Sequence, residues 1–226
     1  MDGDDKNADN APIWLARGSD IYDLIKTEAS RKVVRARTVL IAQGQPVTYI
    51  YFVLKGMAQA FIYTKDGQKC WVADFKPGDL FGHTEILSGA EIEFEVRAEN
   101  GMQLALLPAK TFAELMQEKP KLGYALSRYL AVDMGLAHTR LVELATLPTA
   151  GRVCAELLRM AKPIGKTPGT LIIRPHPVYS NFALRVHSTR ETVSRTVSDL
   201  QKKGIVARET GALVILKPKS LRRLLK

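Results

Sequence analysis

The sequence predicts an α+β fold in which an antiparallel β-barrel or jelly roll comes first, a long helix follows, and a smaller helical domain ends the chain. Three observations lead to this expectation. Short apolar runs alternate with glycine turns between residues 38 and 107. Residues 121–144 contain no proline, and after residue 149 the hydrophobic spacing follows the helical period.

Four domains are expected along the 226 residues. They are an acidic disordered tail (1–11), the β-barrel domain (12–118), a dimerisation helix (119–146) and a winged helix-turn-helix (147–226). The first ten residues hold four Asp and one Lys. Such a polar segment is not a signal peptide, which predicts a cytoplasmic protein. No apolar run approaches the roughly 20 residues of a membrane span, so no membrane partner is expected.

The barrel strands are expected at seven apolar runs. These are residues 38–42, 48–54, 57–63, 69–75, 80–82, 92–98 and 104–107. Asp66-Gly67 lies between two β-rich runs and predicts a hairpin turn. One helix is expected before the strands, at 13–30, and another after them, at 110–117.

The long helix, 121–144, carries an incomplete apolar stripe. Its predicted members are Leu122, Leu126, Tyr129 and Leu136. Two interpretations are open: the stripe packs on the chain's own barrel, or it pairs with a second copy as a parallel dimer seam. We favour the dimer seam, because a helix this long that leaves a compact barrel needs something to cover its apolar side.

The last third of the chain is strongly basic. Residues 147–226 hold 16 Lys and Arg against 4 Asp and Glu, a net charge of +12, whereas the remainder is at −2. An uneven basic charge is typical of nucleic-acid binding. Expected elements here are helices at 149–161, 178–186 and 220–225, a strand at 171–174, and a two-stranded wing at 206–208 and 213–216.

Residues 188–200 combine an apolar stripe with a polar outer face. The stripe consists of Val193, Val197 and Leu200 at helical spacing. Ser188 and Glu191 have the S-x-x-E spacing of a capping box, which predicts that the helix begins there. Lys202-Lys203-Gly204 predicts its end, because glycine adopts the left-handed conformation and cations favour the C-terminal dipole.

The outer face of this helix has the chemistry of a DNA reader. Its predicted base contacts are Arg190, Glu191, Ser194 and Arg195. Arginine donates two hydrogen bonds to guanine, and glutamate accepts one from cytosine. Phosphate contacts are expected from the polar and basic side chains around it, with solvated surface as the alternative. These candidates are Ser188, Thr189, Arg185, Lys202, Lys203, Arg208 and Lys217.

Enzyme chemistry is not predicted. The four histidines lie apart, at residues 83, 138, 176 and 187, without partners at metal-ligand spacing, and no P-loop or nucleophile elbow occurs. No cofactor is therefore expected. A regulatory subunit that uses only the barrel is a weaker alternative, because it gives no reason for the basic last third.

The chain resembles the Crp–Fnr superfamily of bacterial transcription regulators. The resemblance rests on Tyr51–Gly56 (YFVLKG) and Pro77–Gly82 (PGDLFG), which look like a cyclic-nucleotide-binding barrel, and on Thr189–Arg195 (TRETVSR), which looks like the family's helix-turn-helix. It implies a homodimer on a two-fold-related DNA site, with recognition helices about 34 Å apart, and RNA polymerase as a partner.

The resemblance also implies which bases are read. A half-site with a TGA core is expected, read by Glu191 and Arg195. Arg190 adds either a guanine contact or a phosphate contact.

The predicted ligand pocket departs from the family pattern. It comprises Gly82, His83 and Glu85, with histidine where the family has the ribose-binding glutamate. The family's phosphate-binding arginine and hydroxyl positions fall on Ile92 and Glu93. Binding of cAMP is therefore not expected, and two interpretations remain. The barrel is a ligand-free scaffold, or it holds another effector, such as haem near His83 or a cyclic dinucleotide.

Overall fold

The computed structural model describes residues 27–164 and 169–225. It divides into a barrel unit, up to Asp133, and a C-terminal unit, from Met134. The predicted acidic tail and most of the helix expected at 13–30 lie outside the described residues. Ser30 begins a strand and does not end a helix. None of the described helices has the length and apolar character to cross a membrane.

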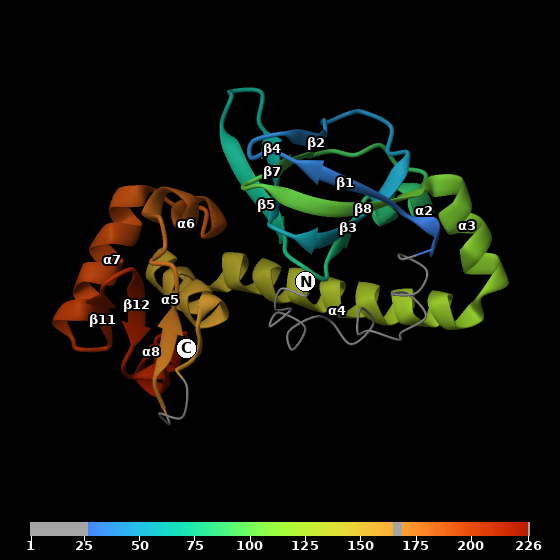
Figure 1. Ribbon diagram of the computed structural model, residues 1–226. Coiled ribbons are helices and arrows are strands. Elements are labelled where there is room, and N and C mark those ends of the chain that lie inside the picture. Colours follow the sequence, from blue (N-terminus) through green and yellow to red (C-terminus); the bar gives the residue numbers. More distant parts are fainter. Residues whose placement is uncertain (1–26, 165–168, 226) are drawn as a thin grey trace. The chain divides into compact units, whose positions relative to one another are not determined.

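The barrel unit consists of two four-stranded antiparallel sheets (Figure 1). The first has the order β1 (Ser30–Val34), β8 (Met102–Pro108), β3 (Tyr49–Lys55), β6 (Leu80–Phe81). The second has the order β2 (Val39–Ile41), β7 (Glu95–Ala98), β4 (Ala58–Tyr63), β5 (Lys69–Phe75). The hairpin at Asp66-Gly67 is confirmed: β4 pairs with β5, and the Gly67 amide donates to the Thr64 carbonyl at 2.9 Å.

The central strands β3 and β8 are buried on both faces. Successive side chains of a strand point to opposite faces. Phe52 accordingly packs towards helices α3 (Ala109–Glu118) and α4 (Pro120–Thr146), whereas its neighbour Val53 faces the barrel interior. This explains why these strands read as continuous apolar runs rather than as an alternation.

Three elements of the barrel unit differ from the sequence prediction. Strand β1 was not expected, because four of its five residues are exposed and show no alternation. Residues His83–Ser88 form a short helix, α2, bounded by Gly82 and Gly89, both with positive φ. Strand β7 begins at Glu95, three residues later than expected.

Much of the predicted apolar stripe of helix α4 packs within the barrel unit. Leu122 and Leu126 are 3% and 7% exposed and belong to the core formed with β3, β8 and α3. The hydroxyl of Tyr129 donates to the Leu80 carbonyl at 3.3 Å. These three side chains are therefore corrected from seam residues to residues that pack on the barrel, as the alternative interpretation predicted. Leu136 is 56% exposed.

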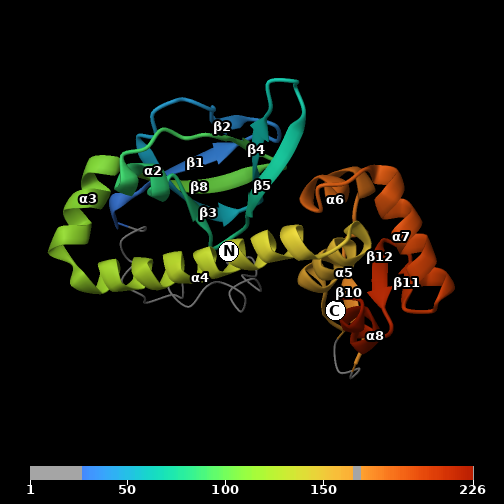
Figure 2. The same ribbon diagram turned by 180° about the vertical axis from the view of Figure 1, so that it is seen from behind.

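The C-terminal unit packs four helices on a small sheet (Figure 2). The helices are α5 (Thr149–Met160), α6 (Tyr179–Arg185), α7 (Arg190–Lys202) and α8 (Pro218–Arg223). The sheet order is β11 (Val206–Glu209), β12 (Ala212–Ile215), β10 (Leu171–Ile173), β9 (Lys162–Pro163). The expected wing is the β11–β12 hairpin, extended by β10 and by β9, which was not predicted. The α+β fold class is thus confirmed.

Candidate nucleic-acid interface

Helix α7 is held in the C-terminal unit by its apolar stripe. Val193, Val197 and Leu200 are 0%, 1% and 3% exposed and lie in the core with α5, α6 and the sheet. This confirms the predicted stripe. A helix anchored this firmly on one side presents its other side in a fixed orientation, which base recognition requires.

The helix begins one residue later than the sequence suggested. Thr189 is the N-cap, and its side-chain oxygen accepts a hydrogen bond from the Thr192 amide at 3.2 Å. The capping box predicted for Ser188 and Glu191 is therefore wrong, because the S-x-x-E spacing is out of register with the actual start. Glu191 instead lies exposed in the first turn.

The end of α7 follows the prediction. Lys203 is the C-cap, and Gly204 has a φ of +61°, which is unfavourable for residues with a side chain. The Ile205 amide donates to the Leu200 carbonyl at 3.0 Å, which closes the helix and directs the chain into β11.

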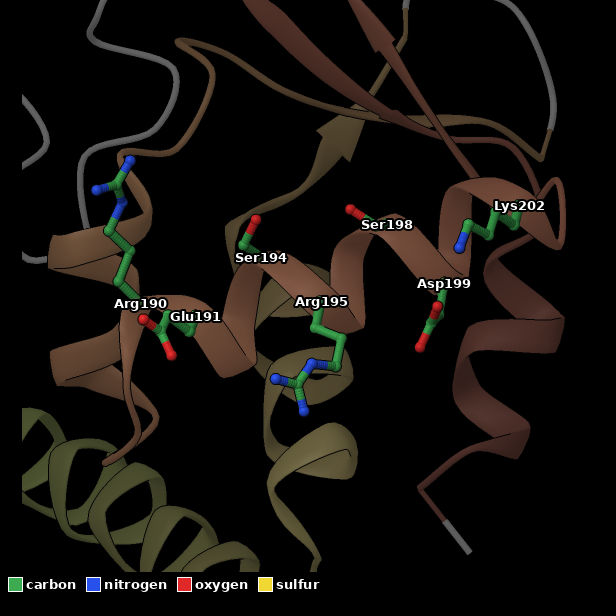
Figure 3. Close-up of a pocket in the computed structure, with 7 residues that line it drawn as sticks. All are labelled: Arg190, Glu191, Ser194, Arg195, Ser198, Asp199 and Lys202. Atoms are coloured by element: carbon green, nitrogen blue, oxygen red, sulfur yellow. The ribbon is translucent and has the colours of Figure 1, made fainter.

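The outer face of α7 presents seven polar side chains (Figure 3). They are Arg190, Glu191, Ser194, Arg195, Ser198, Asp199 and Lys202. The four predicted base-contacting residues all belong to this set. Within the described part of the chain, Arg190, Glu191 and Arg195 form no ion pair. Their hydrogen-bonding groups are therefore available to an external partner.

The phosphate candidates differ in their accessibility. Lys202, Lys203, Arg208 and Lys217 are exposed. Arg185 is not: its side chain is 14% exposed and its Nη1 lies 3.7 Å from Oε1 of buried Glu156. This ion pair turns Arg185 inward, which corrects its prediction as a phosphate contact. Thr189 is exposed but its hydroxyl caps α7, and Ser188 is half-buried.

The turn between α6 and α7 is fixed by Arg152, a residue that sequence reasoning did not identify. Its guanidinium donates to the carbonyls of Val186 at 2.9 Å and His187 at 3.3 Å, within the turn itself. It also donates to the Leu147 carbonyl at 3.0 Å, where α4 has just ended. His187 adopts a φ of +47° there, and partial desolvation, together with the charge of nearby Arg152, lowers its pKa. Nothing in the local sequence pattern distinguishes this arginine from a solvated one.

The predicted ligand pocket residues surround the start of α2. A side chain at Gly82 would approach the Tyr49 carbonyl to 2.7 Å, so only glycine fits this turn. His83 is 5% exposed, and its ring contacts Tyr129 edge-on with centroids 5.6 Å apart. Neither ring nitrogen has a hydrogen-bond partner within the described residues. Burial lowers the pKa of His83 to about 4, so the ring is neutral at pH 7.

The barrel interior near this turn is filled by apolar side chains. Phe81 stacks on Tyr51 with ring centroids 4.7 Å apart and contacts Phe75 at 4.9 Å. Ile92 is 1% exposed and belongs to the same interior cluster. Glu93 is exposed. Among the described residues, no group of three or more His, Cys, Asp or Glu is arranged to hold a metal ion.

Comparisons with known proteins match both units. Residues 31–119 match the family model described as a cyclic nucleotide-binding domain, and residues 151–224 match the Crp-like helix-turn-helix domain. The chain is 26% identical over 183 residues to the cAMP-activated global transcriptional regulator CRP of Salmonella typhimurium. That alignment covers 80% of this chain and 86% of the relative.

Solved structures share the fold. FixK2 from Bradyrhizobium japonicum aligns with a TM-score of 0.74 at 22% identity, covering 87% of this chain and 96% of that one. A CooA mutant from Carboxydothermus hydrogenoformans aligns with a TM-score of 0.80 at 16% identity, covering 96% and 97%. At these identities the likeness concerns the fold.

Proposed function

Because this chain belongs to the Crp–Fnr family of DNA-binding transcription regulators, we propose that it acts as a homodimer on a palindromic DNA site whose half-site contains a TGA core. The expectation that the chain is a regulator and not an enzyme is confirmed by the same comparisons. The observation that carries the proposal is the outer face of α7, polar along its length and rigidly backed by the core.

Base recognition is assigned to the first two turns of α7. Glu191 accepts a hydrogen bond from the amino group of cytosine, and Arg195, one turn later, donates two to guanine. Arg190 lies beside them at the start of the helix, where either a guanine or a phosphate is within the reach of its long side chain. Ser194 lies between them on the same face and offers a hydroxyl to either base edge.

Phosphate binding is assigned to the exposed cations around α7. Lys202 and Lys203 end the helix, Arg208 belongs to strand β11 of the wing, and Lys217 is the N-cap of α8. These four are the cations that remain of the predicted set after Arg185 is removed. Each neutralised phosphate releases counterions, so affinity should fall steeply with salt.

The dimer seam is assigned to a different stripe of α4 from the one the sequence suggested. Tyr124, Met134 and Leu141 are 68%, 57% and 63% exposed, and their spacing of ten and then seven residues places them on one heptad stripe. Leu122 and Leu126 are buried by the barrel unit on the opposite side of the helix. A parallel pair of α4 helices would cover the exposed stripe. Contact with RNA polymerase is inferred from the family alone.

We further propose that the barrel does not require cAMP. The Salmonella relative is described as cAMP-activated, but a cyclic phosphate needs a charge-assisted donor. Here the corresponding positions offer the buried side chain of Ile92 and the exposed carboxylate of Glu93. His83 replaces the ribose-binding carboxylate and is buried against Tyr129.

The test is selection of binding sites from random DNA by the full-length protein without added ligand. We expect a palindromic motif with TGA in each half-site, and no change in affinity when cAMP is added. A motif that emerges only with cAMP would contradict the ligand-free proposal. Enrichment of no motif under any condition would contradict the assigned recognition by α7.

A further inference from the structure

A buried carboxylate lies among three arginines in the C-terminal unit. The Glu156 side chain is 3% exposed, and Arg140 approaches it at 3.4 Å. Arg159 makes a close ion pair with the same oxygen, and Arg185 lies 3.7 Å from the other. Arg159 also contacts both carboxylate oxygens of Glu143 at 2.7 Å. We refer to these five residues as the Glu156 network.

The Glu156 network joins three helices. Arg140 and Glu143 belong to the end of α4, Glu156 and Arg159 to α5, and Arg185 to α6. Two separate contacts therefore cross from α4 to α5: Arg140 with Glu156, and Glu143 with Arg159. A third contact continues from Glu156 to the first helix of the helix-turn-helix. The backbone between α4 and α5 consists only of Leu147 and Pro148.

Stability alone does not account for the Glu156 network. Glu156 lies on the inner side of α5 next to Leu157, which is fully buried. Taking an ion pair out of water is costly, and apolar residues of similar size at such positions are often neutral or stabilising. What the network supplies in addition is direction, because each ion pair fixes the helix that carries it relative to its neighbour.

We infer that Arg140 and Glu143 are positioning residues for DNA recognition. By binding α5 they fix the direction in which α4 enters the helix-turn-helix. In a dimer joined through α4, that direction sets the separation and relative rotation of the two α7 helices. One additional base pair moves the two half-sites about 3.4 Å farther apart. A small change of the angle between α4 and α5 therefore changes which half-site spacing the dimer fits. This inference rests on the proposed function.

The decisive variant is the double substitution Arg140→Gln and Glu143→Gln. It removes one positive and one negative charge, so the net charge is unchanged. It cuts both contacts from α4 while Glu156 keeps Arg159 and Arg185, so no buried carboxylate is left alone. The control is Glu118→Gln together with Lys119→Gln, a charge-neutral pair of exposed residues at the end of α3.

The measurement is the affinity of each full-length protein for a single half-site and for palindromes whose half-sites are spaced one or two base pairs closer or farther apart. We expect wild type and control to prefer one spacing by about tenfold or more, in line with the cost of a mismatched base pair. We expect the double variant to bind the single half-site within about twofold of wild type, while its spacing preference falls to about threefold or less.

Two outcomes would overturn the inference. One is a spacing profile identical to that of wild type. The other is an equal loss on the single half-site and on every palindrome, accompanied by a lower melting temperature, which would show a purely structural role. Glu156→Gln, which weakens the same link from the other side, must broaden the spacing profile as well. If wild type itself shows no preference for palindromes, the proposed function fails first, and the inference fails with it.

Discussion

The outer face of α7 and the interior of the barrel are the two regions in which the sequence predicts binding sites, and they are built in opposite ways. On α7, charged side chains stand exposed on a helix whose inner side is packed. In the barrel, Ile92, Phe81 and Tyr51 belong to an apolar cluster in the region where the sequence predicts the ligand pocket. The α7 face thus offers polar groups to a partner, whereas apolar side chains fill this part of the barrel interior.

The difference shows that the two units are subject to different constraints. The barrel core needs apolar volume of a fitting shape, to which the buried side chain of Ile92 contributes. The α7 face needs particular donors and acceptors at fixed positions, so both the identity and the support of each side chain matter. Each of the following predictions alters one side of this comparison.

The largest effect is expected from placing a cation at Ile92, the position that the sequence aligns with the family's phosphate-binding arginine. Ile92→Arg should destabilise the barrel unit by about 3–5 kcal/mol, because an arginine in the interior cluster is a buried charge without a partner. The measurement is urea unfolding followed by tryptophan fluorescence. Glu93→Arg is the matched control: the same new side chain at the exposed neighbour should cost no more than about 0.5 kcal/mol. A stable Ile92→Arg protein that gains cAMP binding would show that the pocket is present and lacks only one residue.

The second effect concerns the pH dependence of the barrel unit. The pKa of His83 is about 4 in the folded protein, against about 6.5 when unfolded. The unfolded chain therefore takes up this proton first, and stability is lost as the pH falls from about 6.5 towards 4, by up to about 3 kcal/mol. The raised pKa values of Asp79 and Asp133, which result from burial, act in the opposite direction.

The contribution of His83 is isolated by comparing wild type with His83→Leu. The two carboxyl groups remain in both proteins, so the difference in unfolding free energy reports the histidine. We expect this difference to shift in favour of the variant as the pH is lowered from 7 to 4.5. A difference that stays constant over this range would mean that His83 binds its proton equally well in both states.

The third effect tests the face of α7. Arg195→Ala should reduce discrimination at one base pair of each half-site by about 1–3 kcal/mol, because two hydrogen bonds to a base are lost. The measurement is affinity for the palindrome and for the same site with that base pair changed. Arg222→Ala, which removes an exposed arginine on α8, should leave discrimination intact. An equal loss on all sequences would make Arg195 a phosphate contact.

The sequence predicted best where local spacing decides the structure. The stripe of α7 was identified correctly, since 3.6-residue spacing alone determines which side of a short amphipathic helix is buried. The barrel hairpins followed from glycine turns in the same way. Helix α2 was missed because six residues between two glycines are too short to show a period.

Long-range packing explains the other differences. Helix α4 has apolar residues on more than one side, so only the barrel decides that Leu122 is covered and Tyr124 is not. In the sequence Arg185 resembles a surface cation, because its partner Glu156 lies 29 positions earlier in the chain. Only the fold brings the two side chains together. The one available signal was Glu156 itself, a carboxylate within the apolar side of α5.

The smallest effect decides which residue starts the recognition helix. Thr189→Ala should cost about 1 kcal/mol in the C-terminal unit, because the hydrogen bond from the Thr192 amide is lost. Thr189→Ser should restore it, since serine caps at least as well. Ser188→Ala should change stability by no more than about 0.5 kcal/mol if Ser188 does not cap the helix. Thermal unfolding of the three variants compares these positions directly. A larger loss of stability for Ser188→Ala than for Thr189→Ala would show that Ser188 is the N-cap. Glu191 would then belong to the capping box and would have a structural role.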